Sequence, residues 1–243
     1  MKLIILKDYK DVGTKAAELV SKDIIKNKNL VLGLATGETM IPFYRSLVSL
    51  INNKKVDASE IKTFNLDEYV VFDKKNKNGY YYFMNKHLFS KIRIPAENIN
   101  FLNGNVKNLD LECRNYENSI KKNGGIDLQI LGIGRDGHIG FNEPGSSSKS
   151  RTREVLLSRI TRKDNSRFFD GKISKVPKKA LTVGIGTIMK SKKIILLASG
   201  VSKAKIVHRF LHGSIDKNIP ASFLKKHRNI TVILDKEAAS ELD

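Results

Sequence analysis

The stretch from Gly132 to Gly145, GIGRDGHIGFNEPG, holds the highest concentration of chemically capable residues. Its glycines allow tight turns and a close approach of the backbone to a ligand. Asp136 and His138 are two residues apart and lie on one side of an extended loop, and Glu143 can fold back toward the same imidazole. Carboxylates on either side favour the protonated imidazole, which predicts a proton shuttle. One histidine without a second one nearby argues against a zinc site, so no metal is expected.

Asp67 and Glu68 follow the apolar run that ends at Leu66. Successive side chains of a strand point to opposite faces, so only one of these acids can enter a cleft as a base. The other acid is then free for a structural partner. A turn with an acid at the start of the next helix is the simpler interpretation of this segment alone.

Two further features suit a phosphate group. The turn GLATGET, which ends at Thr39, joins a strand to a helix start, where backbone N–H groups and the hydroxyls of Thr36 and Thr39 can bind an anion. No Gly-Lys-Ser/Thr follows, so the turn is not a Walker loop. Arg167 and Lys203 fall near element ends and could clamp a phosphate dianion, although either residue alone could be a surface charge.

These residues must be positioned by alternating strands and helices. Apolar runs predict strands, and helical spacing predicts helices between them. This alternation predicts an α/β fold: a doubly wound, mostly parallel sheet with helices on both faces, forming one Rossmann-like domain over residues 1–243. Ligands of such sheets bind at the carboxyl ends of the strands, where the segments above converge. The strands are expected at residues 2–6, 29–35, 61–66, 98–102, 126–133, 193–198 and 229–234, the helices at 12–25, through 47 and 51, 80–89, 110–121 and 202–211, and a long Gly-rich loop between 133 and 193.

The formal net charge of +19 is compatible with an anionic partner. The basic residues are scattered along the chain and form no stripe interleaved with aromatic residues, so a nucleic-acid partner is not expected. The sequence has no apolar run of about 18 residues, which argues against a membrane span. Cys113 is a lone cysteine, and no signal peptide is recognisable at the N-terminus, so a cytoplasmic protein is expected. Self-association is compatible with the sequence but not predicted by it.

Together these segments resemble the glucosamine-6-phosphate deaminase/isomerase family, whose sister family is the 6-phosphogluconolactonases. The resemblance extends over almost the whole chain, and its most specific part is DGHIGFNEP. The lactonases share the fold and a Gly-Asp-Gly-His loop but usually lack the Asn-Glu-Pro that follows it. The matching stretches are LGLATGET, TFNLDEYV, LGIGRDGHIGFNEPGSS, SRTR, NSRFF and VPKKALTVGIGTI.

The resemblance implies a hydrolytic deaminase and isomerase of amino-sugar metabolism that converts glucosamine-6-phosphate and water to fructose-6-phosphate and ammonia without a cofactor. Asp67 would move a proton from C2 to C1. His138, tuned by Asp136 and Glu143, would open the sugar ring. The residues implied as the phosphate clamp are Thr36, Gly37, Glu38, Thr39, Arg167 and Lys203.

Glu38 departs from the family pattern, which usually has a second glycine at this point of the phosphate turn. A carboxylate there repels a phosphate unless it points away or pairs with a base. Galactosamine-6-phosphate, the C4 epimer, and 6-phosphogluconolactone remain alternative substrates. A non-catalytic sugar-phosphate sensor or nucleic-acid binder that uses the +19 charge is the third alternative. It is disfavoured because the acids and the histidine of the predicted site are all present.

Overall fold

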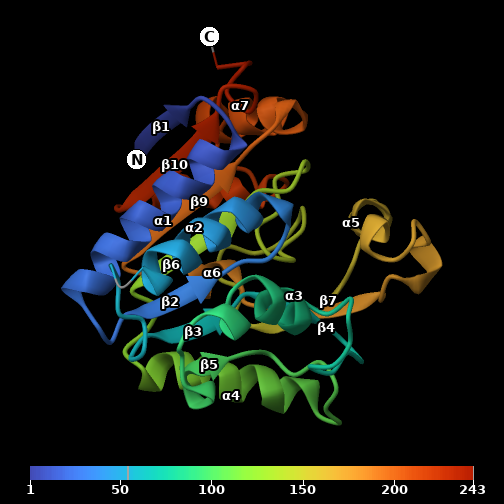
Figure 1. Cartoon of the computed structure of the whole chain (residues 1–243). Coiled ribbons are helices and arrows are strands. Elements are labelled where there is room, and N and C mark those ends of the chain that lie inside the picture. The colour runs from blue at the N-terminus through green and yellow to red at the C-terminus, as the bar shows by residue number, and fades with distance from the viewer. Residues whose placement is uncertain (54, 243) are drawn as a thin grey trace.

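The computed structural model describes residues 1–53 and 55–242. Its centre is a seven-stranded sheet in which every neighbouring pair of strands is parallel (Figure 1). The predicted α/β fold is therefore confirmed. In spatial order the strands are β1 (Lys2–Leu6), β10 (Ile230–Asp235), β9 (Lys193–Ala198), β6 (Leu128–Gly132), β2 (Val31–Leu34), β3 (Lys62–Asn65) and β5 (Ile99–Asn100).

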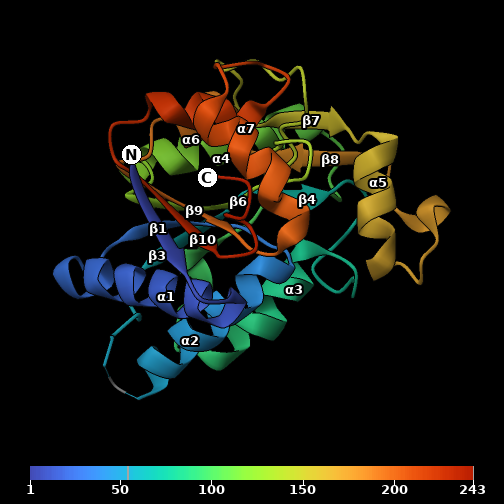
Figure 2. The same ribbon diagram turned by 90° about the horizontal axis from the view of Figure 1, so that it is seen from above.

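Helices cover both faces of the sheet, as Figure 2 shows: α1 and α2 lie on one side and α6 and α7 on the other. Helix α1 begins where Asp8 accepts hydrogen bonds from the backbone N–H groups of Lys10 and Asp11. Its buried residues recur at helical spacing and pack toward the sheet. The helix bounds are α1 Tyr9–Lys26, α2 Ile41–Asn52, α3 Tyr80–His87, α4 Leu109–Lys122, α5 Arg159–Asn165, α6 Ile185–Ile188 and α7 Ala204–His212.

A second, antiparallel sheet lies beside the first and consists of β4 (Asp67–Tyr69), β8 (Lys179–Thr182) and β7 (Arg153–Leu156). It packs on a small apolar cluster that includes Tyr69 and Phe141. Helix α5 stands out from the body of the molecule beyond this sheet (Figure 1). The predicted long loop between residues 133 and 193 is therefore wrong, because β7, α5, β8 and α6 lie within it.

The chain passes from one sheet to the other at Leu66. Its N–H donates to the carbonyl oxygen of Leu34 in the large sheet, and its carbonyl oxygen accepts from the N–H of Val183, next to β8. The strand expected at residues 61–66 thus ends at Asn65, and Asp67 begins a new strand. This crossing places Asp67 in the corner between the two sheets.

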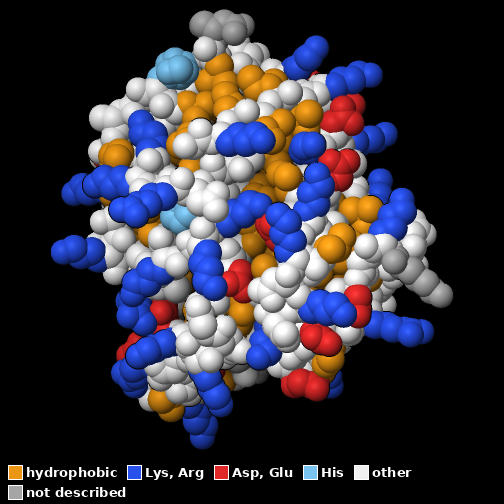
Figure 3. Space-filling model, turned by 90° about the vertical axis from the view of Figure 1, so that its left-hand side faces the viewer, with side chains coloured by type: hydrophobic (Ala, Val, Ile, Leu, Met, Phe, Trp, Pro, Cys, Tyr) orange, Lys and Arg blue, Asp and Glu red, His pale blue; other side chains and the backbone are white. Residues whose placement is uncertain are grey.

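Basic side chains are spread over the surface. Figure 3 shows lysines and arginines scattered across one face without a continuous stripe, in agreement with their scatter along the sequence. Among the described residues, no helix is long and apolar enough to cross a membrane.

Candidate active site

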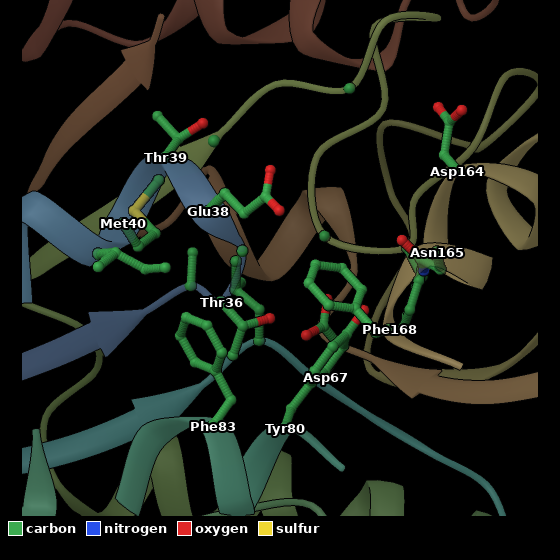
Figure 4. Close-up of a pocket in the computed structure, with 18 of the residues that line it drawn as sticks. Thr36, Glu38, Thr39, Met40, Asp67, Tyr80, Phe83, Asp164, Asn165 and Phe168 are labelled. Atoms are coloured by element: carbon green, nitrogen blue, oxygen red, sulfur yellow. The ribbon is translucent and has the colours of Figure 1, made fainter. Parts of the chain in front are cut away.

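A cleft of about 580 Å³ opens at the carboxyl ends of four neighbouring strands, β3, β2, β6 and β9. The convergence predicted from the sequence is therefore observed, and the volume suits a small-molecule ligand. All the predicted site residues except Asp136 and Glu143 line this cleft. Figure 4 shows Thr36 and Glu38 on one side of it, Asp164, Asn165 and Phe168 on the other, and Asp67 at the lower centre, next to Phe168 in this view.

The turn after β2 forms the end of the cleft where the sequence predicts phosphate binding. Gly37 has a φ of 107°, which is accessible to glycine at little cost. A short 3₁₀ helix, Glu38–Met40, then leads into α2. Thr36, Gly37, Glu38 and Thr39 all line the cleft.

The carboxylate of Asp67 faces the cleft from the corner between the sheets and is only 6% exposed. Burial, with a smaller contribution from the charge of Glu68, raises its pKa to about 8. No hydrogen-bond donor is found for this carboxylate among residues 1–53 and 55–242. A β-carbon added at Gly140 would lie 3.3 Å from Oδ2 of Asp67, so this glycine leaves the space that the carboxylate occupies. Asp67 is therefore a buried carboxyl group that faces the cleft without a hydrogen-bond partner among the described residues.

The carboxylate of Glu68 points the other way, as the alternation of a strand requires. It accepts hydrogen bonds from the backbone N–H groups of Tyr69, Tyr80 and Tyr81, each at 2.9 Å, and so holds the first turn of α3. Burial raises its pKa to about 7, against the opposing effect of these hydrogen bonds. Glu68 is the structural member of the acidic pair.

His138 is held by Asp136, whose Oδ1 lies 2.6 Å from Nδ1 of the imidazole. Burial of Asp136 is outweighed by the hydrogen bond and charge of His138, so that the pKa of Asp136 is lowered. The ring packs so closely on Gly134 that a β-carbon there would lie 2.1 Å from Cε1. His138 lines the cleft, whereas Asp136 lies behind it and acts on its orientation.

Glu143 is placed differently from the expectation. Both of its carboxylate oxygens accept the backbone N–H of Ser158, at 3.1 and 3.0 Å, just before α5. No hydrogen bond or ion pair joins its carboxylate to His138 among the described residues, and Glu143 does not line the cleft. The expected direct contact with the imidazole is thus not observed, because the N–H at the start of α5 takes its place.

Cationic side chains gather at the mouth of the cleft. Nζ of Lys203 donates to the carbonyl oxygen of Ile133 at 2.8 Å. Burial, and then the charge of Arg135, lower the pKa of Lys203 to about 8. Nη2 of Arg135 lies 3.8 Å from Oδ1 of Asp164, and Nη1 of Arg167 lies 3.1 Å from Oε2 of Glu38. The two arginines are thus each paired with an acid across the cleft.

Sequence reasoning missed several lining residues. Arg135 stands inside the glycine-rich loop, and its charge beside Asp136 was the available signal. Asn165 lines the cleft and donates to the Tyr69 hydroxyl at 2.9 Å. It lies two residues before Arg167, in a stretch already singled out. The aromatic wall that Tyr80 and Phe83 contribute had no signal beyond a helical pattern.

A buried free carboxylate, an aspartate-held histidine and a set of cations share one cleft at the carboxyl ends of a parallel sheet. An α/β fold with such a site is suited to acid–base chemistry on a small anionic ligand. Comparison with known proteins specifies the class further. The family model described as glucosamine-6-phosphate isomerases/6-phosphogluconolactonase matches residues 8–233. The chain belongs to this family, and the resemblance predicted from its motifs is confirmed.

Full-length relatives agree with this assignment. A glucosamine-6-phosphate deaminase of Clostridium botulinum is 49% identical over 243 residues, which are 100% of this chain and 99% of that protein. The solved structure of a monomeric glucosamine-6-phosphate deaminase superposes with a TM-score of 0.97 at 44% identity, over 99% of this chain and 100% of the other. A 6-phosphogluconolactonase from Thermotoga maritima, at 22% identity and a TM-score of 0.75, covers 96% of this chain and 98% of its own and shares the fold.

Proposed function

We propose that this chain is a glucosamine-6-phosphate deaminase, which converts glucosamine-6-phosphate and water to fructose-6-phosphate and ammonia. The relatives that match its full length at nearly half of all positions carry this name. Its lone cysteine is free and buried. A phosphorylated substrate and an unpaired thiol both fit a cytoplasmic enzyme.

The reaction needs a proton at the ring oxygen first. His138 lines the cleft and is held by Asp136 through Nδ1, so Nε2 is the nitrogen that can exchange a proton with the sugar. Protonation of the ring oxygen, with loss of the proton from the C1 hydroxyl, breaks the C1–O5 bond and gives the open-chain aldehyde. The observed ring geometry supports this role.

Asp67 then acts on the open chain. Its carboxylate takes the proton from C2, and the C1 carbonyl oxygen takes a proton from the imidazolium of His138, which gives an enolamine with a hydroxyl at C1. Asp67 returns its proton to C1 and leaves a C2 iminium. Water converts the iminium to the ketone and releases ammonia, and the proton freed in this step returns to His138. A pKa raised to about 8 makes Asp67 a stronger base than an ordinary aspartate. Arg167, Lys203 and the Thr36–Thr39 turn would bind the phosphate at the mouth of the cleft.

The observation that carries the proposal is the free carboxylate of Asp67 in the cleft that also holds His138. The test is ammonia release from glucosamine-6-phosphate by wild type, Asp67→Asn and His138→Gln. Each variant should lose about 10²- to 10⁴-fold in kcat. Matched controls are Asp110→Asn and His208→Gln, which change exposed residues of the same types on α4 and α7.

The same assay should include galactosamine-6-phosphate and 6-phosphogluconolactone. A wild type that ignores glucosamine-6-phosphate but consumes one of these would overturn the substrate assignment and leave the family unchanged. Full activity in Asp67→Asn would instead remove the proposed base.

A further inference from the structure

The carboxylate of Glu38 forms an ion pair with the guanidinium of Arg167. The proposed function assigns this same guanidinium to the substrate phosphate. Oε2 of Glu38 lies 3.1 Å from Nη1 of Arg167, and both side chains are half-exposed at the mouth of the cleft. In Figure 4, Glu38 extends toward the segment that carries Asp164, Asn165 and Phe168. An incoming phosphate therefore meets an arginine that already has an anionic partner.

Each member of this pair is anchored by another contact. The carbonyl oxygen of Glu38 accepts a hydrogen bond from the Tyr9 hydroxyl, and Glu38 begins the 3₁₀ turn after Gly37. The guanidinium of Arg167 lies over the ring of Phe168, 4.8 Å from its centroid. These contacts hold the backbone on one side and the guanidinium on the other in position for the ion pair.

Two other cationic side chains at the mouth of the cleft also have partners already. Asp164 pairs with Arg135 over a longer distance, 3.8 Å. Lys203 already donates to a backbone carbonyl, and its pKa is lowered to about 8. A phosphate dianion must therefore displace Glu38 from Arg167 and then lie close to the displaced carboxylate. Both requirements weaken phosphate binding.

We propose that Glu38 is an internal competitor for Arg167 that the phosphate of the substrate must displace, and that it sets the threshold affinity an anion needs to bind in the cleft. Because the competition weakens every anion by a similar factor, only a ligand with further contacts in the cleft binds at low concentration. A phosphorylated sugar has such contacts, and inorganic phosphate does not. The inference rests on the proposed function for the role of Arg167, and it assigns Glu38 the task of keeping free phosphate out of the site.

The test is Glu38→Gln, which removes the charge and keeps the shape. Binding of inorganic phosphate is measured by calorimetric titration, which needs no turnover, and KM is measured with glucosamine-6-phosphate. We expect the dissociation constant of phosphate and the KM of glucosamine-6-phosphate each to fall about three- to tenfold, with kcat changed less than about twofold. The difference from wild type should shrink at about 0.5 M salt.

Two controls separate competition from general charge. Asp164→Asn removes one negative charge at the same mouth and frees Arg135, which the proposed function does not assign to the phosphate, so it should change phosphate affinity less than about twofold. In an Arg167→Ala background, Glu38→Gln should likewise change phosphate affinity less than about twofold, because the competed group is absent.

Unchanged phosphate binding in Glu38→Gln would overturn the inference, and weaker binding would show that Glu38 holds Arg167 in place for the substrate. An equal gain in Asp164→Asn, or a gain that persists without Arg167, would reduce the effect to bulk charge and would also overturn it. A wild type that releases no ammonia would overturn the proposed function. The phosphate titrations would still test the competition between Glu38 and an anion.

Discussion

Oδ1 of Asp136 holds His138 at two points, lying 2.6 Å from Nδ1 of the ring and accepting the backbone N–H of the same residue at 3.2 Å. A carboxylate this close is an acceptor, so Nδ1 carries a proton and Nε2 is the nitrogen left available for proton exchange. Asp136 does not line the cleft, whereas His138 does. Asp136 is thus a positioning residue for the imidazole.

Asp136→Asn should therefore impair the proton transfer and leave substrate binding nearly intact. We expect kcat to fall about 100-fold and KM to change less than about threefold. Steady-state kinetics of ammonia release measure both, with Asp110→Asn as the control for loss of an exposed aspartate on α4. A raised KM with an unchanged kcat would contradict this role.

The raised pKa of Asp67 also predicts a pH dependence of stability. Between about pH 4 and 8 the folded protein holds a proton on Asp67 that the unfolded chain has released, since an unfolded aspartate titrates near 3.9. The contribution of Asp67 to the free energy of unfolding is therefore complete below about pH 4. This contribution is lost as the pH rises toward 8.

Asp67→Asn has no such proton to lose. Between pH 5 and 8 the free energy of unfolding of the wild type should therefore fall by about 2–4 kcal/mol relative to this variant. This range lies below the full effect of about 1.4 kcal/mol per pH unit. Denaturant unfolding at several pH values measures this, and Asp110→Asn should follow the wild type. Parallel curves for wild type and Asp67→Asn would mean that Asp67 titrates normally.

The lowered pKa of Lys203 predicts that substrate capture weakens at alkaline pH. Its pKa is lowered to about 8, first by burial and then by the charge of Arg135, so the free enzyme loses this cation as the pH rises. The value of kcat/KM, which reports the free enzyme, should fall above about pH 8. Lys203→Arg keeps its charge to much higher pH and should move this fall upward by more than about one pH unit.

Lys205→Arg, two residues further on and exposed on α7, is the matched control and should keep the wild-type profile. A limb that belongs to the titration of the substrate is common to all three proteins. If Lys203→Arg and wild type show the same alkaline limb after each is scaled to its own maximum, Lys203 does not set it.

The position of the site could be predicted from the sequence because it depends on a general property of parallel sheets. Asp67, His138 and Lys203 follow strands β3, β6 and β9, and the carboxyl ends of parallel strands lie at one edge. The divergence of Asp67 and Glu68 follows equally from the alternation of side chains along a strand.

The second sheet could not be predicted, for physical reasons. Strands β4, β7 and β8 are three or four residues long, and β7, with the sequence REVL, is only partly buried. Such short segments show no period that distinguishes them from a loop. Ser158 and Arg167 lie between β7 and β8, so their positions depend on the second sheet. The contacts of Glu143 with Ser158 and of Glu38 with Arg167 therefore could not be predicted without that sheet.

Glu143 permits a prediction that distinguishes its expected role from its observed one. Its two oxygens hold the N–H of Ser158, the residue whose hydroxyl also accepts the N–H of Thr161 in the first turn of α5. Arg167 follows at the end of the same segment. If Glu143 acts through this segment, its loss should loosen the presentation of Arg167 and weaken substrate binding more than it slows chemistry.

We therefore expect Glu143→Ala to raise KM about three- to tenfold, with kcat reduced less than about fivefold, and to speed proteolytic cleavage within residues 158–176. Glu143→Gln keeps an acceptor oxygen for Ser158 and should retain most of the wild-type KM and protease resistance. Steady-state kinetics and limited proteolysis of both variants measure this. A fall in kcat of about 100-fold in both, with KM and cleavage unchanged, would instead mean that the charge of Glu143 reaches His138 during turnover, as the loop sequence suggested.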